Sequence, residues 1–253
     1  MPVSVGQIME LCEKIAPRED AEEWDNVGLL AGSASAPVSK VLCALDLTEA
    51  VVHEAVDRGA EMILTHHPIL FRGRKNLRAD DAEGRMLRAL VRADIAHYAM
   101  HTNYDNAMPG VNDALAAALG LKNVNAVDRC MRQGLTECKT FGEFADHVEN
   151  ALGGPVRRYG RADSPVRLVS VLGGAGGSYL EAALEASSSV FVTGEISYHA
   201  ALGAVDDGMC VLEAGHAATE RPGILALATA LQKAADAVQY PICVLNSEVG
   251  LFL

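Results

Sequence analysis

Segments of buried-strand length alternate with helical segments along the first half of the chain. Residues 41–47 form a continuous apolar run, and residues 48–60 follow with a helical pattern between a Thr48 N-cap and Gly59. The alternation continues in a strand at 62–67, a helix at 80–93, a strand at 95–102 and a helix at 110–121, after an amphipathic helix at 3–16. Such alternation is typical of α/β proteins with a largely parallel sheet. The pattern therefore predicts an α/β fold.

The same alternation resumes near residue 127. The capping-box pair Thr140 and Glu143 predicts the start of a helix that ends near Gly154. Strands are expected at 129–135, 166–172, 190–193, 209–214 and 241–246, with helices at 179–186, 198–208 and from 219 to 235. We therefore expect two α/β units with largely parallel or mixed sheets.

Charge and cysteine content narrow the class of protein. The formal net charge is −12, from 33 acidic and 21 basic residues, which argues against nucleic acid as a partner. Three short basic clusters are interpreted as solvated surface charge rather than phosphate contacts: Arg72, Arg74 and Lys75; Arg129 and Arg132; and Arg157, Arg158 and Arg161. The six cysteines form no C-x-x-C pair, which favours a reducing compartment. The N-terminal residues do not resemble a secretory leader, and no apolar run has membrane-spanning length, so we expect a cytoplasmic protein without membrane contact.

The run EMILTHHPIL places two adjacent histidines at the end of a predicted strand. Pro68 cannot donate a hydrogen bond to a strand ladder, so the strand should end at His67 and release both imidazoles into a loop. Adjacent histidines rarely share one tetrahedral ion. They suit two ions about 3.5–4 Å apart, with one histidine on each and a carboxylate bridging between them.

Three further clusters follow apolar runs closely: His101 with Asp105, His216 with Glu220, and His199 with Glu195. Ligands in open α/β sheets bind beyond the carboxyl ends of strands, so these clusters could share one rim with His66 and His67. If the chain is already helical at His216, this residue and Glu220 lie on the same helix face. If the helix begins at Thr219, His216 instead approaches from the preceding loop.

Structural alternatives remain open for each of these features. His53 and His147 lie on predicted helix faces without a partner, His97 is expected to pack inside a strand, and no compact metal-ligand spacing such as H-E-x-x-H is present. Spacing alone leaves both a metal site and structural roles open for His66 and His67. The glycine-rich stretch Gly173–Gly177 could surround a phosphate, but a tight turn that permits close packing is favoured. There is no G-x-S-x-G elbow.

Several ordered stretches resemble a known family: EEWDNVGLLAG (22–32), LTHHPILFRG (64–73), MHTNYDNAMPGVNDALA (100–116), VTGEISYHAAL (192–202) and GHAATERPGI (215–224). They are similar to the dinuclear metal centre proteins typified by the NGG-one-interacting-factor-three, or Nif-three-like, proteins. Many of these are called GTP cyclohydrolase 1 type 2 homologues. The resemblance runs from about residue 5 to the end of the chain, and this chain looks like the short form that lacks a central inserted domain.

The resemblance implies a specific ligand set for two divalent metals. It assigns His66 and Asp105 to one ion, His67 and His216 to the other, and Glu220 to a bridging position. His101 matches a position that lines the same site, as a further ligand or a proton carrier. Asp25 and Asn26 match a family motif whose role the sequence does not give, and His199 is expected beside the site.

The resemblance also has consequences for the fold and the assembly. In similar proteins, each chain folds as two α/β units, and six chains assemble into a homohexameric toroid. Because the implied ligands come from both ends of the chain, the C-terminal segment should return to the first unit. We therefore expect a metal-binding domain of residues 1–126 plus 212–253 and a second domain of residues 127–211.

The leading hypothesis is a metal-dependent hydrolase, GTP cyclohydrolase 1 type 2-like, that uses a metal-activated water on a small nucleotide-like or phosphate-bearing substrate. His101 would carry protons and Glu220 would act with the metals. The alternative is a non-enzymatic metal-binding regulator, metallochaperone or interaction scaffold. Imidazole and carboxylate ligands suit Zn or Fe first, with Mn, Co and Ni as further candidates.

Overall fold

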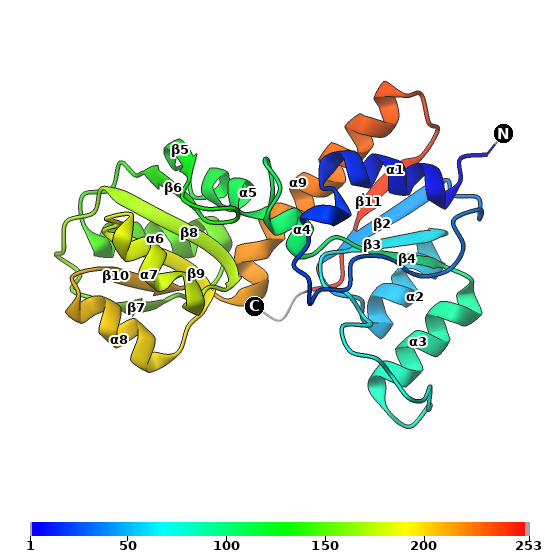
Figure 1. Ribbon diagram of the computed structural model, residues 1–253, viewed down its shortest axis with the longest axis horizontal. Coiled ribbons are helices and arrows are strands. Elements are labelled where there is room, and N and C mark those ends of the chain that lie inside the picture. The colour runs from blue at the N-terminus through cyan, green and yellow to red at the C-terminus, as the bar shows by residue number, and fades with distance from the viewer. Residues whose placement is uncertain (1, 251–253) are drawn as a thin grey trace. The chain divides into compact units, whose positions relative to one another are not determined.

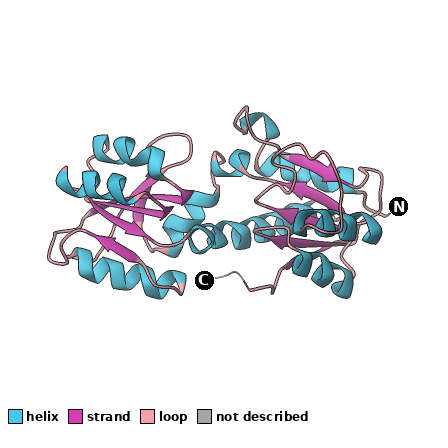
Figure 2. Ribbon diagram, turned by 90° about the horizontal axis from the view of Figure 1, so that it is seen from below, coloured by secondary structure: helices cyan, strands magenta, loops and turns pink. Residues whose placement is uncertain are grey.

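The computed structural model describes residues 2–250 and divides the chain into two compact units. One contains the residues up to Ala107 together with Ile224–Gly250, and the other is Met108–Gly223. Each unit has its own sheet with helices packed on it (Figures 1 and 2). This confirms the α/β class expected from the sequence. The domain boundaries near residues 126 and 212 remain a prediction.

The first unit is built on a five-stranded sheet in the order β1-β4-β3-β2-β11. Its strands are β1 (Gly28–Ala31), β2 (Lys40–Ala44), β3 (Met62–Thr65), β4 (Ala96–Ala99) and β11 (Cys243–Asn246). All neighbouring pairs are parallel except β1 with β4. Because β11 pairs with β2, the C-terminal segment does return to the first unit, as expected.

Helices cover both faces of this sheet. Figure 1 shows α1 (Val5–Ile15) on one face, and α2 (Glu49–Arg58) and α3 (Ala82–Ala93) on the other. The predicted caps of α2 are confirmed, since Thr48 Oγ1 accepts a hydrogen bond from Val51 N and Gly59 adopts the left-handed conformation. Short helical turns lie at η1 (Arg18–Asp20) and α4 (Thr102–Asp105). The long helix α9 (His216–Ala237) contributes residues to both units.

The second unit has a six-stranded mixed sheet in the order β5-β6-β8-β9-β10-β7. Its strands are β5 (Lys122–Ala126), β6 (Arg132–Leu135), β7 (Arg157–Tyr159), β8 (Leu168–Ala175), β9 (Val190–Glu195) and β10 (Cys210–Glu213). Only the β8–β9 and β9–β10 pairs are parallel; the other neighbouring pairs are antiparallel. The sheet is therefore of the mixed kind that the sequence left open.

Two apolar clusters hold the helices of this unit against opposite faces of its sheet. α5 (Val111–Ala118) and α6 (Phe141–Leu152) share one cluster with β8, β9 and β10. α7 (Leu180–Glu185), which follows η2 (Gly177–Tyr179), and α8 (Tyr198–Asp206) share the other. The predicted capping box at the start of α6 is present, with Glu143 N donating to Thr140 Oγ1 and the Glu143 carboxylate accepting from Thr140 N.

The structure differs from the sequence prediction mainly at sheet edges. The strands β1, β5 and β7 were not expected, and β5 and β7 carry charged and amide side chains that are largely exposed. Edge strands are commonly polar, so their sequence lacks the apolar run that marks a buried strand. In addition, β3 ends at Thr65 rather than at His67, because Thr65 Oγ1 donates to the His67 carbonyl and bends the chain there.

All six cysteines are free thiols. Cys43 and Cys210 are buried, as expected of small apolar side chains, and burial raises the pKa of the Cys43 thiol to about 12. Cys243 is exposed instead, because β11 lies at the edge of its sheet. Within residues 2–250, no helix combines the length and the apolar character that crossing a bilayer would require.

His97 lies in β4 and its side chain is fully buried. Its Nε2 atom is 2.8 Å from Thr65 Oγ1 on the neighbouring strand β3. Burial disfavours the charged imidazolium and lowers the pKa of His97 from 6.5 to about 4.

We expect acid to weaken the fold through His97. Between its ordinary pKa of 6.5 and the folded value of about 4, the unfolded chain binds a proton that the folded chain does not. The free energy of unfolding therefore falls as the pH drops through this window, by on the order of 3 kcal/mol. The His97→Gln variant cannot titrate there, so urea unfolding should show a smaller acid-induced loss of stability than in the original chain. Equal losses in the two proteins would contradict this prediction.

Candidate metal centre

Three parallel strands deliver polar side chains to the same edge of the first sheet. His66 and His67 follow β3, His101 follows β4, and Asp46 follows β2. These three strands are neighbours and run parallel, so their carboxyl ends lie side by side. This topology brings residues that are far apart in the sequence to one place.

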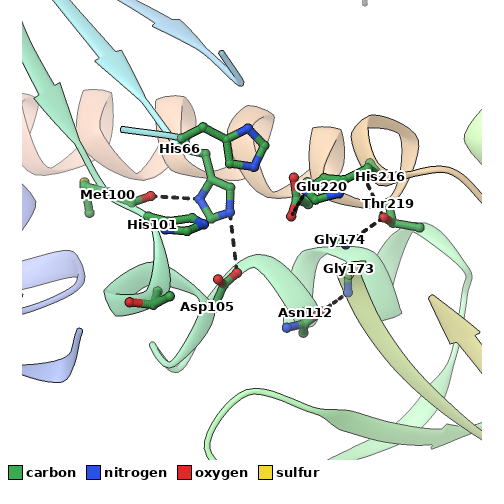
Figure 3. A network of polar contacts seen from close by, with 12 residues as sticks. His66, Met100, His101, Asp105, Asn112, Gly173, Gly174, His216, Thr219 and Glu220 are labelled. Atoms are coloured by element: carbon green, nitrogen blue, oxygen red, sulfur yellow. Dashed lines mark hydrogen bonds and ion pairs between the residues drawn. The ribbon is translucent and has the colours of Figure 1, made fainter. Parts of the chain in front are cut away.

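His66 is held in a fixed orientation by the main chain. Its Nδ1 atom lies 2.8 Å from the Met100 carbonyl oxygen, and its ring is fully buried (Figure 3). Because Nδ1 must donate to that carbonyl, the lone pair of the neutral ring is on Nε2. This Nε2 atom points toward Asp105, whose Oδ1 atom is 3.6 Å away. The pair is therefore arranged as two ligands of one cation would be.

His67 is oriented in the same way by a carboxylate. Its Nδ1 atom is 2.8 Å from Oδ1 of Asp46, which fixes the ring. Metal-binding histidines usually donate their second nitrogen to a carboxylate or a carbonyl group, which fixes the ring and makes the other nitrogen a better ligand. Asp46 was not singled out from the sequence. Its signal is that it follows the strand next to β3 by two residues.

His101 is held by Asp25, which gives this aspartate of the EEWDN stretch a structural role. The Nδ1 atom of His101 is 3.0 Å from Asp25 Oδ1, and Asp25 Oδ2 accepts hydrogen bonds from the amide and the hydroxyl of Thr102. Partial burial alone would raise the pKa of Asp25. The hydrogen bonds from His101 and Thr102 outweigh it and hold the pKa of this carboxyl well below its usual range. Asp25 is therefore a stable anionic acceptor.

The three imidazoles converge. Each offers one ring nitrogen, and these atoms lie within 4.8 Å of one another. The ring centroid of His66 is 5.1 Å from that of His67 and also 5.1 Å from that of His101. For all three residues, Nδ1 has an oxygen partner that fixes the orientation of the ring. This donor set fits a divalent transition metal, which imidazole binds well.

His216 and Glu220 form a pair in the second unit, at the start of α9. The helix begins at His216, so of the two geometries left open by the sequence, the one with both side chains on one helix face is present. Nε2 of His216 is 3.2 Å from Glu220 Oε1, and its Nδ1 is 3.4 Å from Glu195 Oε1. Glu220 is only 4% exposed. A buried carboxylate beside an imidazole is a second arrangement of metal-competent side chains.

The glycine-rich stretch at the end of β8 packs against this pair. Three of its amides already donate to side chains of the same unit: Gly173 to Asn112, Gly174 to Thr219 and Gly176 to Thr193 (Figure 3 shows the first two). Gly174 has a positive φ of 67°, and a Cβ atom there would overlap Glu220 Oε1 and lie 3.2 Å from His216 Nε2. The close packing that the sequence favoured is present, but residues 173–175 belong to strand β8 and do not form a tight turn.

Gly174 should therefore be needed to place Glu220. We expect Gly174→Ala to displace the carboxylate and to lower the free energy of unfolding by about 1–2 kcal/mol, because alanine is strained at positive φ and meets a buried side chain. Gly177→Ala is the matched control, since its added methyl group would meet nothing within 4 Å. Chemical denaturation of both variants tests this, and equal stabilities would contradict it.

Each unit thus brings together some of the predicted site residues. His66, His67, His101 and Asp105 lie together in the first unit, and His216 and Glu220 lie together in the second. His199 is exposed on α8, with its ring centroid 5.3 Å from that of Tyr198. His147 has a structural partner, the Leu119 carbonyl oxygen.

The fold and these clusters define an α/β protein with a candidate metal centre. A family model described as Duf34/NIF3 (NGG1p interacting factor 3) matches residues 3–249, so the chain belongs to this family and the resemblance is confirmed. A Clostridium perfringens protein named GTP cyclohydrolase 1 type 2 homolog is 31% identical over 244 residues, covering 92% of this chain and 93% of that protein. A Streptomyces coelicolor protein of the same name is 35% identical over 233 residues, covering 86% and 82%.

The fold agrees with solved structures of the family. The crystal structure of a Staphylococcus aureus protein has a TM-score of 0.96 to this chain at 28% identity, and the match covers 100% of this chain and 98% of that one. The architecture is therefore shared over the whole described length.

Proposed function

We propose that this chain is a dinuclear divalent-metal protein that hydrolyses a small nucleotide-like or phosphate-bearing substrate, in the manner of a GTP cyclohydrolase 1 type 2. The observation that carries the proposal is the set of three histidines whose Nδ1 atoms have oxygen partners and which each offer one ring nitrogen within 4.8 Å of the others. The names of the relatives from Clostridium perfringens and Streptomyces coelicolor support the choice of reaction.

The proposed ligand set joins the two clusters. His66 and Asp105 would bind one ion, His67 and His216 the other, and Glu220 would bridge them. Support comes from each unit by itself: His66 Nε2 and Asp105 Oδ1 point toward one another, and so do His216 Nε2 and Glu220 Oε1. The proposal therefore predicts that metal binding depends on residues from both units. Imidazole with carboxylate suits Zn or Fe first, and Mn, Co or Ni next.

When bound, a pair of divalent cations lowers the pKa of a coordinated water and polarises a substrate oxygen. The residues of the chain supply orientation and proton transfer. Asp46 and Asp25 fix the rings of His67 and His101, so the geometry of the site is set before a substrate arrives. With its Nδ1–H donating to anionic Asp25, His101 can accept a proton at Nε2 and later release it.

Metal content and turnover test the proposal together. We expect two ions per chain in the original protein, measured by elemental analysis after reconstitution with each candidate metal. His66→Ala and Glu220→Ala should each lower metal content and reduce hydrolysis of nucleotides and phosphoesters about 100-fold or more, because each removes a direct ligand. His101→Ala should keep its metals but lose turnover, if the imidazole carries protons.

His53→Ala is the matched control, since His53 is an exposed residue on α2 and is not among the proposed ligands. Unchanged metal content in both ligand variants would overturn the metal assignment. Metal binding without turnover of any tested substrate would favour a regulator, metallochaperone or scaffold instead.

The same family membership supports two further proposals, a homohexamer and a cytoplasmic location. Analytical ultracentrifugation of the full chain tests the first, and fractionation of cells that express a tagged chain tests the second. The acidic charge of −12 supports a small-molecule substrate rather than nucleic acid.

A further inference from the structure

Two aromatic side chains of the first unit are exposed beside the histidine cluster. Trp24 is 61% exposed and Phe71 is 44% exposed. Their ring centroids are 5.8 Å apart with an angle of 69° between the planes, which is an edge-to-face contact. Trp24 is also the single tryptophan of a chain that is only 5% aromatic. The largest apolar side chain available is thus kept outside the core.

The aromatic pair adjoins the candidate metal ligands through His101. The His101 ring centroid is 6.2 Å from that of Trp24 and 6.3 Å from that of Phe71. The same imidazole is 5.1 Å from the ring of His66 and 5.5 Å from that of His67. One imidazole therefore separates the exposed pair from the other two histidines. A molecule lying on Trp24 could extend its remaining atoms to the histidine cluster.

Trp24 is exposed but its loop is firmly held. On its C-terminal side, Asp25 accepts hydrogen bonds from His101 and Thr102, and Asn26 Nδ2 donates to the Leu70 carbonyl oxygen at 2.6 Å. On its N-terminal side, Glu22 N donates to Thr102 Oγ1. The Asn26 bond also ties this loop to the loop that carries Phe71. Both loops are therefore held in place before any ligand binds, which reduces the entropy lost on binding.

The charges of the second loop indicate which flat ligand the pair would bind. Arg72 and Lys75 follow Phe71 closely and are exposed, whereas Arg74 is paired with Asp81 and Glu83. Exposed aromatic rings can also bind quaternary ammonium groups, and Glu23 beside Trp24 would attract one, but the two cations that follow Phe71 would repel such a ligand. An anionic ligand with a flat ring meets both conditions. A nucleotide has both parts, a π-face for stacking and a phosphate for the cations.

We propose that Trp24 and Phe71 form a stacking platform for the base of a nucleotide, whose phosphate is contacted by Arg72 and Lys75. The platform narrows the substrate class from phosphate-bearing molecules to those with an aromatic base. This inference rests on the proposed function for what happens to the nucleotide after binding, namely its hydrolysis. The binding step itself needs neither metal nor turnover. Asp25 and Asn26 serve as positioning residues, because they hold His101 and the Phe71 loop against Trp24.

The single tryptophan allows a direct test. Emission from Trp24 should be quenched saturably when GMP is added to the full chain in the presence of a chelator, and ribose 5-phosphate, which lacks a base, should have no effect. Phe71→Leu should weaken GMP binding about tenfold, the effect of losing part of one stacking contact. Trp24→Leu, followed by calorimetry, should weaken it at least as much. Arg72→Gln should weaken binding of GMP but not of guanosine.

Leu77→Ala is the matched control, because Leu77 is a 53% exposed side chain of the same segment that makes none of these ring contacts. It should leave GMP affinity unchanged. Quenching by GMP in the presence of the chelator needs no metal, which separates this inference from the metal proposal. If metal-dependent turnover is found for substrates without a base and GMP does not quench Trp24, the platform is overturned and the hydrolase survives.

Two other results would overturn the platform. One is a failure to discriminate, seen either as equal affinity for GMP and ribose 5-phosphate or as GMP affinity that is unchanged in both Trp24→Leu and Phe71→Leu. The other is loss of self-association in Trp24→Leu, measured by sedimentation, with unchanged GMP affinity. That result would identify the aromatic pair as a contact between copies of the chain.

Discussion

The parallel pairing of β2, β3 and β4 is the constraint on which the rest of the candidate site depends. Parallel neighbours end at the same edge, so the residues that follow them, Asp46, His66, His67 and His101, are brought together by the sheet alone. The ladder fixes this placement through main-chain hydrogen bonds, so the positions of the side chains follow from the fold. The loops then add orientation, chiefly through Asp25 and Asp46.

Buried residues were the easiest to predict from the sequence. Apolar runs such as that of β2, and caps such as Thr48 and Gly59 around α2, act locally, so the sequence shows them directly. β5 and β7 were missed because their polar residues face solvent at a sheet edge. The end of β3 was placed two residues too late, since the bend depends on the Thr65 hydroxyl bond to His67, which sequence pattern does not reveal.

The residues of the candidate site also divide into those that the sequence predicts and those that it does not. His66, His67, His101 with Asp105, and His216 with Glu220 could be selected because imidazoles and carboxylates that closely follow predicted strands are conspicuous. The family resemblance added their assignment to two ions. The partners of the histidines could not be selected. Met100 acts through a main-chain oxygen and leaves no trace in the sequence. Asp25 lies 76 residues from His101, and only the folded chain brings them within 3.0 Å.

The nature of these partners affects how each histidine tolerates mutation. His67 and His101 depend on carboxylates, so one codon change at position 46 or 25 removes the acceptor and frees the ring to rotate. His66 depends on the peptide carbonyl of residue 100, which every amino acid possesses. A substitution at that position keeps the acceptor as long as the backbone conformation is unchanged. In the first unit, substitution of the partner residue therefore leaves the acceptor of His66 in place, whereas it can remove the acceptors that orient His67 and His101.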